Sequence, residues 1–202
     1  AAQLNNQASM MNKDVMLKGA DHSEHLPDYT SVSPVAFKQQ LAEVAGSYLL
    51  LKDAFVATNV ALAGEQAAKL VASLGKVDMS LLDGDAHLYW MEQLSAMEAH
   101  TAQIQSSNEI EQQRTQFSFL SQALIKSLKV FGVPASTYYV QHCPMANDNE
   151  GADWLSREEQ VQNPYFGDKM LTCGTVQETI TKNFKNPAIE ATSTPRMTGH
   201  NH

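Results

Sequence analysis

An apolar side chain recurs at every third or fourth position in residues 33–55, SPVAFKQQLAEVAGSYLLLKDAF. The recurring residues are Phe37, Leu41, Val44, Tyr48, Leu51 and Phe55. Because an α-helix turns once in about 3.6 residues, this spacing places all six on one helical face. Ser33 and Pro34 are typical of a helix start, with serine as the N-cap and proline at the first helical position. The stretch therefore predicts a long amphipathic helix.

Three further stretches show the same period. Their apolar positions are Ala63, Ala67, Leu70 and Leu74 in the second, Trp90, Leu94, Met97, Thr101 and Ile104 in the third, and Phe117, Leu120, Leu124, Leu128 and Phe131 in the fourth. Gly75 ends the second stretch, a turn at residues 83–85 opens the third, and Gly132 and Pro134 stop the fourth. The sequence thus predicts four amphipathic helices.

The connections between these helices are short, which implies that successive helices run antiparallel. Ser106 with Glu109 is a candidate capping box at the start of the fourth helix. We predict a mainly α fold, with an antiparallel four-helix bundle over residues 33–135. Residues 137–140, TYYV, are β-prone, and glycines and prolines follow. We therefore expect a short extended, β-containing C-terminal cap over residues 136–182.

The two ends of the chain lack a sustained apolar period. We predict one domain over residues 33–182, a flexible lead-in over 1–32 and a flexible tail over 183–202. Both ends hold soft or borderline metal ligands, namely Met10, Met11, Met16, His22 and His25 in the lead-in and Met197, His200 and His202 in the tail. Such side chains can capture copper weakly, although a polar tail of chance composition is the simpler interpretation.

Charge and hydropathy exclude two classes of protein. The formal net charge is −8 and the 14 Lys and Arg residues are scattered, which argues against nucleic-acid binding. No stretch approaches the roughly 18 apolar residues of a membrane span, so we do not expect an integral membrane protein. The opening Ala1-Ala2 fits a mature chain left after signal-peptide cleavage, and a trimmed chain would look the same. We expect a periplasmic or secreted location.

The segments with the most specific chemistry are residues 141–146, QHCPMA, and 168–174, DKMLTCG. Residues two apart on a strand point the same way, so Cys143 and Met145 can share a face. Residues three apart in a turn are neighbours, so Met170 and Cys173 can converge. Two thiolates and two thioethers are soft ligands that favour Cu(I), and Ag(I) should behave alike. His142 is a candidate nitrogen ligand, although strand alternation directs it away from Cys143.

A structural interpretation of the same residues is equally open. Cys143 and Cys173 can form a disulfide that closes a thirty-residue loop, which would stabilise the fold by roughly 3–4 kcal/mol. Met145 and Met170 can be core residues, as most methionines are.

The cap also resembles a known family. The motifs are YVQHCPMA at 139–146, GADWLS at 151–156 and NPYFGDKMLTCG at 163–174, and residues 48–56 and 114–121 resemble the family's first and fourth helices. The resemblance covers roughly residues 35–180. It points to a domain-of-unknown-function family that occurs alone in secreted proteins and fused to periplasmic adaptor subunits of copper/silver efflux systems.

The resemblance implies a helical bundle, a periplasmic location and a role in handling copper or silver. It implies Cys143, Met145, Met170 and Cys173 as ligands, whereas the position of His142 is not fixed as histidine in the family. A dinuclear copper site is an alternative to a mononuclear one, because two thiolates can bridge two metals. The expected partner is a copper/silver efflux adaptor or another periplasmic copper protein. The alternative is an interaction module with a structural Cys143–Cys173 disulfide and no metal.

The remaining candidates have simpler interpretations. His87 and His100 lie more than three turns apart on one predicted helix, so they cannot share a metal and are expected at the surface or boundary. Trp154 can cover the sulfur site or simply pack, and residues 163–167 predict a turn that sets the approach of the second sulfur pair. The acidic residues Asp148, Glu150 and Asp153 are expected to be solvated. No nucleophile triad, phosphate loop or Cys-x-x-Cys pair is present, so we predict no enzyme.

Overall fold

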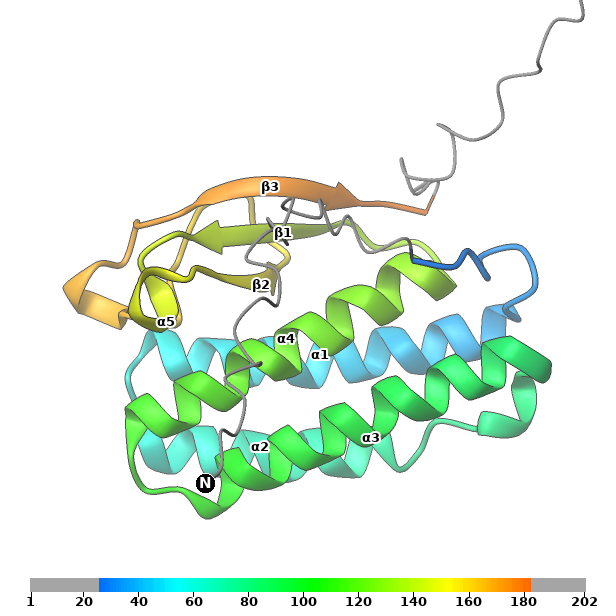
Figure 1. Cartoon of the computed structure of the whole chain (residues 1–202), viewed down its shortest axis with the longest axis horizontal. Helices are drawn as coiled ribbons and strands as arrows, with labels where there is room; N and C mark the ends of the chain where they lie inside the picture. Colours follow the sequence, from blue (N-terminus) through cyan, green and yellow to red (C-terminus); the bar gives the residue numbers. More distant parts are fainter. Residues whose placement is uncertain (1–25, 183–202) are drawn as a thin grey trace, which may run out of the picture.

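The computed structural model describes residues 26–182, and residues 1–25 and 183–202 lie outside this description. The described chain is mainly helical, with a small three-stranded antiparallel sheet in its C-terminal part (Figure 1). This confirms the predicted mainly α fold with a β-containing cap. The long helices are α1 (Val35–Val56), α2 (Val60–Leu74), α3 (Gly84–Ser106) and α4 (Ile110–Phe131).

The apolar face predicted for the first helix is the buried face of α1. All six of its recurring apolar residues are fully buried. Burial of one such side chain contributes about 1.5–3 kcal/mol, so this face is a large share of the driving force for folding. The helix begins one residue later than predicted, because Pro34 is its N-cap. Ser33 instead donates its hydroxyl hydrogen to the Tyr29 carbonyl oxygen at 2.6 Å.

The apolar positions of the other three helices are buried as predicted. The capping box predicted at Ser106 and Glu109 is wrong. Ser106 is the last residue of α3, and Glu109 is the N-cap of α4. The hydroxyl that accepts from the Glu109 N–H, at 3.1 Å, belongs to Ser107. The connection between α3 and α4 consists only of residues 107–109, so Ser106 is still part of α3. The local pattern therefore selected a serine that cannot cap α4.

Each long helix packs on the next one along the chain, and α1 also contacts α4. Figure 1 shows α1 and α4 next to the sheet, with α2 and α3 on the side away from it. The Asn59 side chain caps α2 by accepting from the Leu62 N–H at 2.9 Å, and a short 3-10 helix, η1 (Met79–Leu81), lies between α2 and α3. None of the helices within residues 26–182 is long and apolar enough to cross a membrane.

Residues 26–32, the end of the predicted lead-in, lie against the helices. The Tyr29 ring is 6.0 Å from the ring of Phe131 and 6.2 Å from that of Tyr89, measured between centroids. The Tyr29 N–H donates to the Val130 carbonyl oxygen at 2.9 Å. This segment therefore covers the apolar end of α3 and α4 before α1 begins.

The sheet has the strand order β2-β1-β3, with β1 (Tyr138–Cys143) in the centre. Both β2 (Ala152–Ser156) and β3 (Thr175–Ile180) pair with it in antiparallel register. A tight turn, α5 (Ala146–Asn149), lies between β1 and β2, and a 3-10 turn, η2 (Gly167–Lys169), precedes β3. Since β2 contacts α4 and η2 contacts α1, the cap rests on these two helices.

A buried hydroxyl group ties the sheet to the helices. The Leu155 N–H of β2 donates to the Tyr48 hydroxyl oxygen of α1 at 3.2 Å. The Tyr48 hydroxyl lies 2.6 Å from Ser121 Oγ of α4, and Ser121 donates its own hydrogen to the Phe117 carbonyl oxygen. Tyr48 is therefore the donor to Ser121, and one tyrosine hydroxyl links three elements.

Candidate metal site

The structure brings the two cysteines of the chain into contact. Cys143 Sγ and Cys173 Sγ are 3.3 Å apart, and both residues are free thiols. Cys143 is the last residue of β1 and is fully buried, with 0% of its surface exposed, whereas Cys173 lies in the loop before β3 and is half-buried. The two sulfur-bearing segments predicted from the sequence thus meet through their thiols.

Strand pairing explains why the two thiols meet. His142 of β1 is the register partner of Thr175 in β3, so the chain just before β3 passes the Cys143 end of β1. Gly174 makes this close passage, with a φ of +141°, and a Cβ there would lie 2.8 Å from the His142 carbonyl oxygen and 2.8 Å from the Trp154 ring. Only glycine fits both the backbone conformation and the available space.

Asn163 holds the Cys173 backbone. Its side-chain amide Nδ2 donates to the Cys173 carbonyl oxygen at 2.7 Å, and its Oδ1 accepts the Tyr165 N–H at 2.8 Å. The Asn163 backbone N–H donates to the Leu171 carbonyl oxygen at 2.8 Å. Asn163 is fully buried, so these contacts are sheltered from water and rigidify the loop. The predicted turn at residues 163–167 therefore bears directly on the position of the second thiol.

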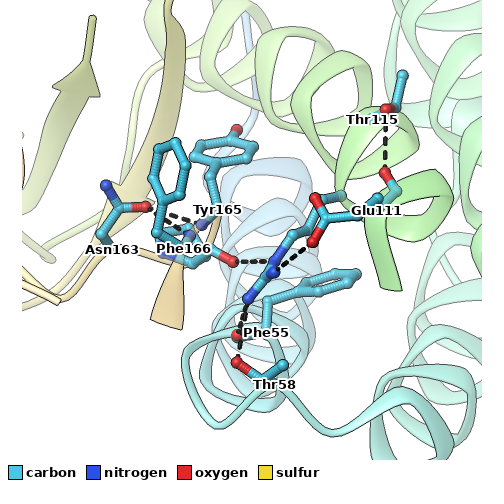
Figure 2. Close-up of polar contacts among 9 residues, drawn as sticks. Phe55, Thr58, Glu111, Thr115, Asn163, Tyr165 and Phe166 are labelled. Atoms are coloured by element: carbon cyan, nitrogen blue, oxygen red, sulfur yellow. Dashed lines mark hydrogen bonds and ion pairs between the residues drawn. The ribbon is translucent and has the colours of Figure 1, made fainter. Parts of the chain in front are cut away.

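Arg114 of α4 holds this turn on the helices through its guanidinium. Figure 2 shows Asn163, Tyr165 and Phe166 of the turn on one side of these polar contacts, with Thr58 and Glu111 of the helical region on the other. Its Nε donates to the Pro164 carbonyl oxygen at 2.9 Å, and Nη2 donates to Thr58 Oγ1 at 3.1 Å. Nη1 donates to Glu111 Oε1 at 3.0 Å, which pairs the charge of this 4% exposed arginine. The guanidinium has the fork of donors needed to join separate backbone and side-chain oxygens.

Gly167 allows the turn to lie this close to the end of α1. Its φ is +56°, and a Cβ there would lie 2.9 Å from the Val56 carbonyl oxygen and would overlap the Thr58 hydroxyl. Contacts running from Arg114 through residues 163–167 thus connect α4 to Cys173.

The two methionines of the predicted set flank the thiol pair in the chain. Met145 lies two residues after Cys143, between β1 and α5, and is 46% exposed. Met170 is half-buried, and its carbonyl oxygen accepts the Cys173 N–H at 3.0 Å, so the two residues share one turn. The thiols are in direct contact, and the thioethers lie on the two short segments that carry them.

His142 lies apart from the thiol pair. Its Nδ1 is 2.7 Å from Oδ1 of Asp153, its cross-strand partner in β2. Adjacent residues of β1 point to opposite faces of the sheet, so His142 is directed away from Cys143. A Cβ at Gly151 would meet the His142 ring at 2.7 Å, so the ring packs against the chain at that glycine. The structure therefore does not bring His142 to the sulfur pair.

Contact between the thiols also affects their ionisation. The pKa of Cys173 is raised above its ordinary value, first by the hydrogen bond with Cys143, then by burial and by the charge of Cys143. The neutral thiol is thus favoured at Cys173 while the pair is metal-free. A metal ion that binds thiolates must displace this proton.

Two buried aromatic side chains lie beside the segment that carries Cys173. Trp154 is fully buried in β2, and its ring lies 5.9 Å from that of Tyr165 in a T-shaped arrangement. Tyr165 donates its hydroxyl hydrogen to the Asp153 carbonyl oxygen at 2.7 Å, and burial raises its pKa well above the ordinary value. The Trp154 ring therefore packs directly against the backbone at Gly174, next to Cys173.

The other candidate ligands do not assemble into a site. His87 Nδ1 contacts the Met79 carbonyl oxygen, and His100 stacks on Phe119 and contacts Gln116. Within residues 26–182, no group of three or more His, Cys, Asp or Glu side chains is placed to hold a metal ion. A Cys/Met site needs no such group, since it contains two cysteines. The Met and His residues of the two tails lie outside the described residues.

Sequence reasoning missed Arg114. The residue lies three positions before Phe117, and its face continues the apolar face of α4 toward the N-terminus. A charged residue at a position that the helical period assigns to the core is a signal for a buried polar contact, because unpaired burial of a charge is costly. Nothing in the sequence indicates that the partner is Pro164.

A family comparison covers the helices. Residues 44–136 match the family described as Protein of unknown function (DUF3347). The DUF3347 match begins within α1 and ends before β1, so it includes Arg114 but neither cysteine. It confirms the resemblance to a domain of unknown function, while the link to efflux adaptors stays a prediction. No curated protein and no solved structure matches the chain.

Proposed function

We propose that the chain is a periplasmic or secreted copper-binding protein that holds Cu(I), or Ag(I), in a sulfur site made by Cys143, Cys173, Met145 and Met170. Its role is copper homeostasis or tolerance, with hand-over of the metal to an efflux system. The supporting observation is the 3.3 Å approach of two free thiols that are thirty residues apart in the chain.

The donor chemistry fits a soft monovalent metal. Two thiolates satisfy the preference of Cu(I) for sulfur, and thioethers from the flanking methionines add neutral soft donors. The full burial of Cys143, with the Trp154 ring packed beside Gly174, supports a low-dielectric surrounding, which favours the reduced metal over Cu(II). The metal supplies no reaction in this proposal, and the chain binds, shelters and releases it.

We assign α1–α4 the role of a scaffold and interpret them as an antiparallel four-helix bundle. Short connections and the packing of each helix on the next support this arrangement. The bundle presents α1 and α4 to the cap, and Arg114 and Tyr48 are the polar side chains through which it holds the cap. The rigid helices thereby keep the thiol pair assembled without metal.

An anaerobic titration with Cu(I) against a competing chelator tests the proposal. The reduced protein should bind one Cu(I) tightly, or two if the thiolates bridge a pair. Cys143→Ser should lose most of this affinity, and Met170→Leu should lower it while leaving both thiols titratable. Met91→Leu, at a 38% exposed methionine on α3, is the matched control. Unchanged affinity in Cys143→Ser would exclude the assigned site.

The second candidate function is an interaction module of an efflux or sensing complex, with a structural disulfide and no metal. The same Sγ–Sγ approach favours it, since a disulfide could form at these positions. It predicts that the protein purified without reductant has no free thiols and that reduction gives no Cu(I) binding. A thiol count combined with the titration separates the two functions.

A further inference from the structure

The two thiols are close enough to bond to each other without moving the backbone far. Their sulfur atoms are 3.3 Å apart, against about 2.05 Å in a disulfide. Rotation of the two side chains covers a difference of about 1.3 Å. Cys143 is paired with Ala152 in the sheet and Cys173 is held by Asn163, so both backbones keep the sulfur atoms aligned.

The two thiols differ in how a solute reaches them. Cys173 is half-buried in the loop before β3, whereas Cys143 is fully buried at the end of the central strand. Thiol–disulfide exchange requires access to the attacking sulfur. A soluble disulfide therefore meets Cys173 first, and Cys143 can attack only a sulfur already attached to Cys173.

The geometry points to a reversible dithiol–disulfide couple, in which Cys173 is the modification site for a low-molecular-weight disulfide such as glutathione disulfide and Cys143 is the resolving thiol. This couple differs from a structural disulfide, because the folded protein holds the pair in contact while both thiols are free.

The reaction has two exchange steps. In the first, the Cys173 thiol gives up its proton and its sulfur attacks one sulfur of the soluble disulfide, whose S–S bond breaks, and one soluble thiol leaves with that proton. In the second, the Cys143 thiolate attacks Cys173 Sγ, the mixed disulfide bond breaks, and the second soluble thiol leaves. The protein loses two electrons and two protons, and the soluble disulfide gains them as two thiols.

Oxidation of the two thiols would also abolish the metal site, a consequence that rests on the proposed function. The internal disulfide removes both thiolates and leaves only thioether sulfur, which is a much weaker donor set for Cu(I). Bound Cu(I) should in turn protect Cys173 from modification. The protein would then hold copper while its two thiols are reduced and release the metal when they are oxidised to the disulfide.

The test uses the full chain, metal-free and fully reduced, treated anaerobically with glutathione disulfide. The wild type should lose both free thiols, retain no glutathione by intact mass, and regain both thiols with dithiothreitol. Cys143→Ser should accumulate one glutathione at Cys173. Folded Cys173→Ser should react at least about tenfold more slowly than the same variant in urea, because the fold buries Cys143.

Three results would overturn the couple. The wild type could keep a glutathione at Cys173 without an internal bond, Cys143 could be modified first in peptide maps of the briefly treated wild type, or dithiothreitol could fail to reopen the bond in folded protein. The maps of the wild type keep the test valid if a variant does not fold. Cu(I) titration of reduced and oxidised wild type distinguishes the two proposals, since absent binding to the reduced form excludes the copper function alone.

Discussion

The helical region and the C-terminal cap are held together by different interactions. In α1–α4 the contacts are mostly apolar, and the largest side chains are fully buried. In the cap, the segment that carries Cys173 is fixed by directed hydrogen bonds from Arg114 and Asn163. Apolar burial thus determines whether the chain folds, while a few buried polar groups determine whether the two thiols meet.

The largest effect is expected at Phe117, which belongs to both regions. Its ring lies 4.7 Å from Phe55, 5.1 Å from Tyr48 and 5.8 Å from Tyr165 of the cap. Phe117→Ala should lower the free energy of unfolding by about 3–5 kcal/mol, measured by urea unfolding with circular dichroism. Phe119→Ala, at a 44% exposed position on the same helix, should cost less than about 1 kcal/mol. Equal losses of unfolding free energy in the two variants would contradict the assignment of Phe117 to the core.

Arg114→Met should loosen the cap and leave the helical region unchanged. It leaves the Pro164 and Phe55 carbonyl oxygens without their guanidinium donor, which should cost about 1.5–3 kcal/mol. Hydrogen exchange should rise in residues 163–173 and stay unchanged in α2 and α3. Arg157→Met is the control, because this exposed residue contacts a side chain of the sheet, lying over the Tyr138 ring at 5.1 Å and donating to the Tyr138 hydroxyl at 3.3 Å. Faster exchange throughout the helices would show that Arg114 supports the whole core.

Asn163→Ala should affect the thiols more than the fold. The change releases the Cys173 carbonyl oxygen and the Tyr165 N–H, at a cost of about 1–2 kcal/mol. Loss of a group that orients a ligand typically lowers metal affinity by about 10–100-fold, and the same titration with Cu(I) measures it. Gln160→Ala, at an exposed position in the preceding loop, should leave the affinity unchanged. Lower stability with unaltered affinity would show that Cys173 needs no such support.

The smallest expected effect is a graded dependence of Cu(I) affinity on pH. The raised pKa of Cys173 favours its neutral thiol, so the metal must displace a proton when it binds. Apparent affinity should therefore fall as pH falls from 7 to 6, by at most about tenfold for each proton released. Titrations at both pH values, with proton release followed in weak buffer, measure this. Affinity that rises on acidification would contradict thiolate binding.

The helices were predictable because each carries its own periodic signal. Phe37 to Phe55 specify the buried face of α1 without reference to any other segment. Helix ends were less predictable, since Ser33 bonds to Tyr29 rather than capping α1. Serine can meet several nearby backbone groups, and sequence does not indicate which of them it bonds to.

The candidate site was predictable only in part. Spacing and resemblance indicated Cys143 and Cys173, and strand alternation indicated that His142 points elsewhere. The contacts of Arg114 with Pro164 and of Asn163 with Cys173 depend on a loop conformation, and the first spans fifty residues of chain. No periodic pattern records such a pairing, so it had to come from the structure.

The Tyr48 hydroxyl has a consequence for how the protein can be observed. Burial raises the pKa of Tyr48 far above its ordinary value, because ionisation would place a charge in the protein interior, and the hydrogen bonds with Ser121 and the Leu155 N–H offset only part of this effect. Its phenol should thus stay un-ionised in alkaline solution for as long as β2 remains docked on α1 and α4. In alkaline solution, the rise in tyrosinate ultraviolet absorbance that comes from Tyr48 should therefore report detachment of the cap, without any added label.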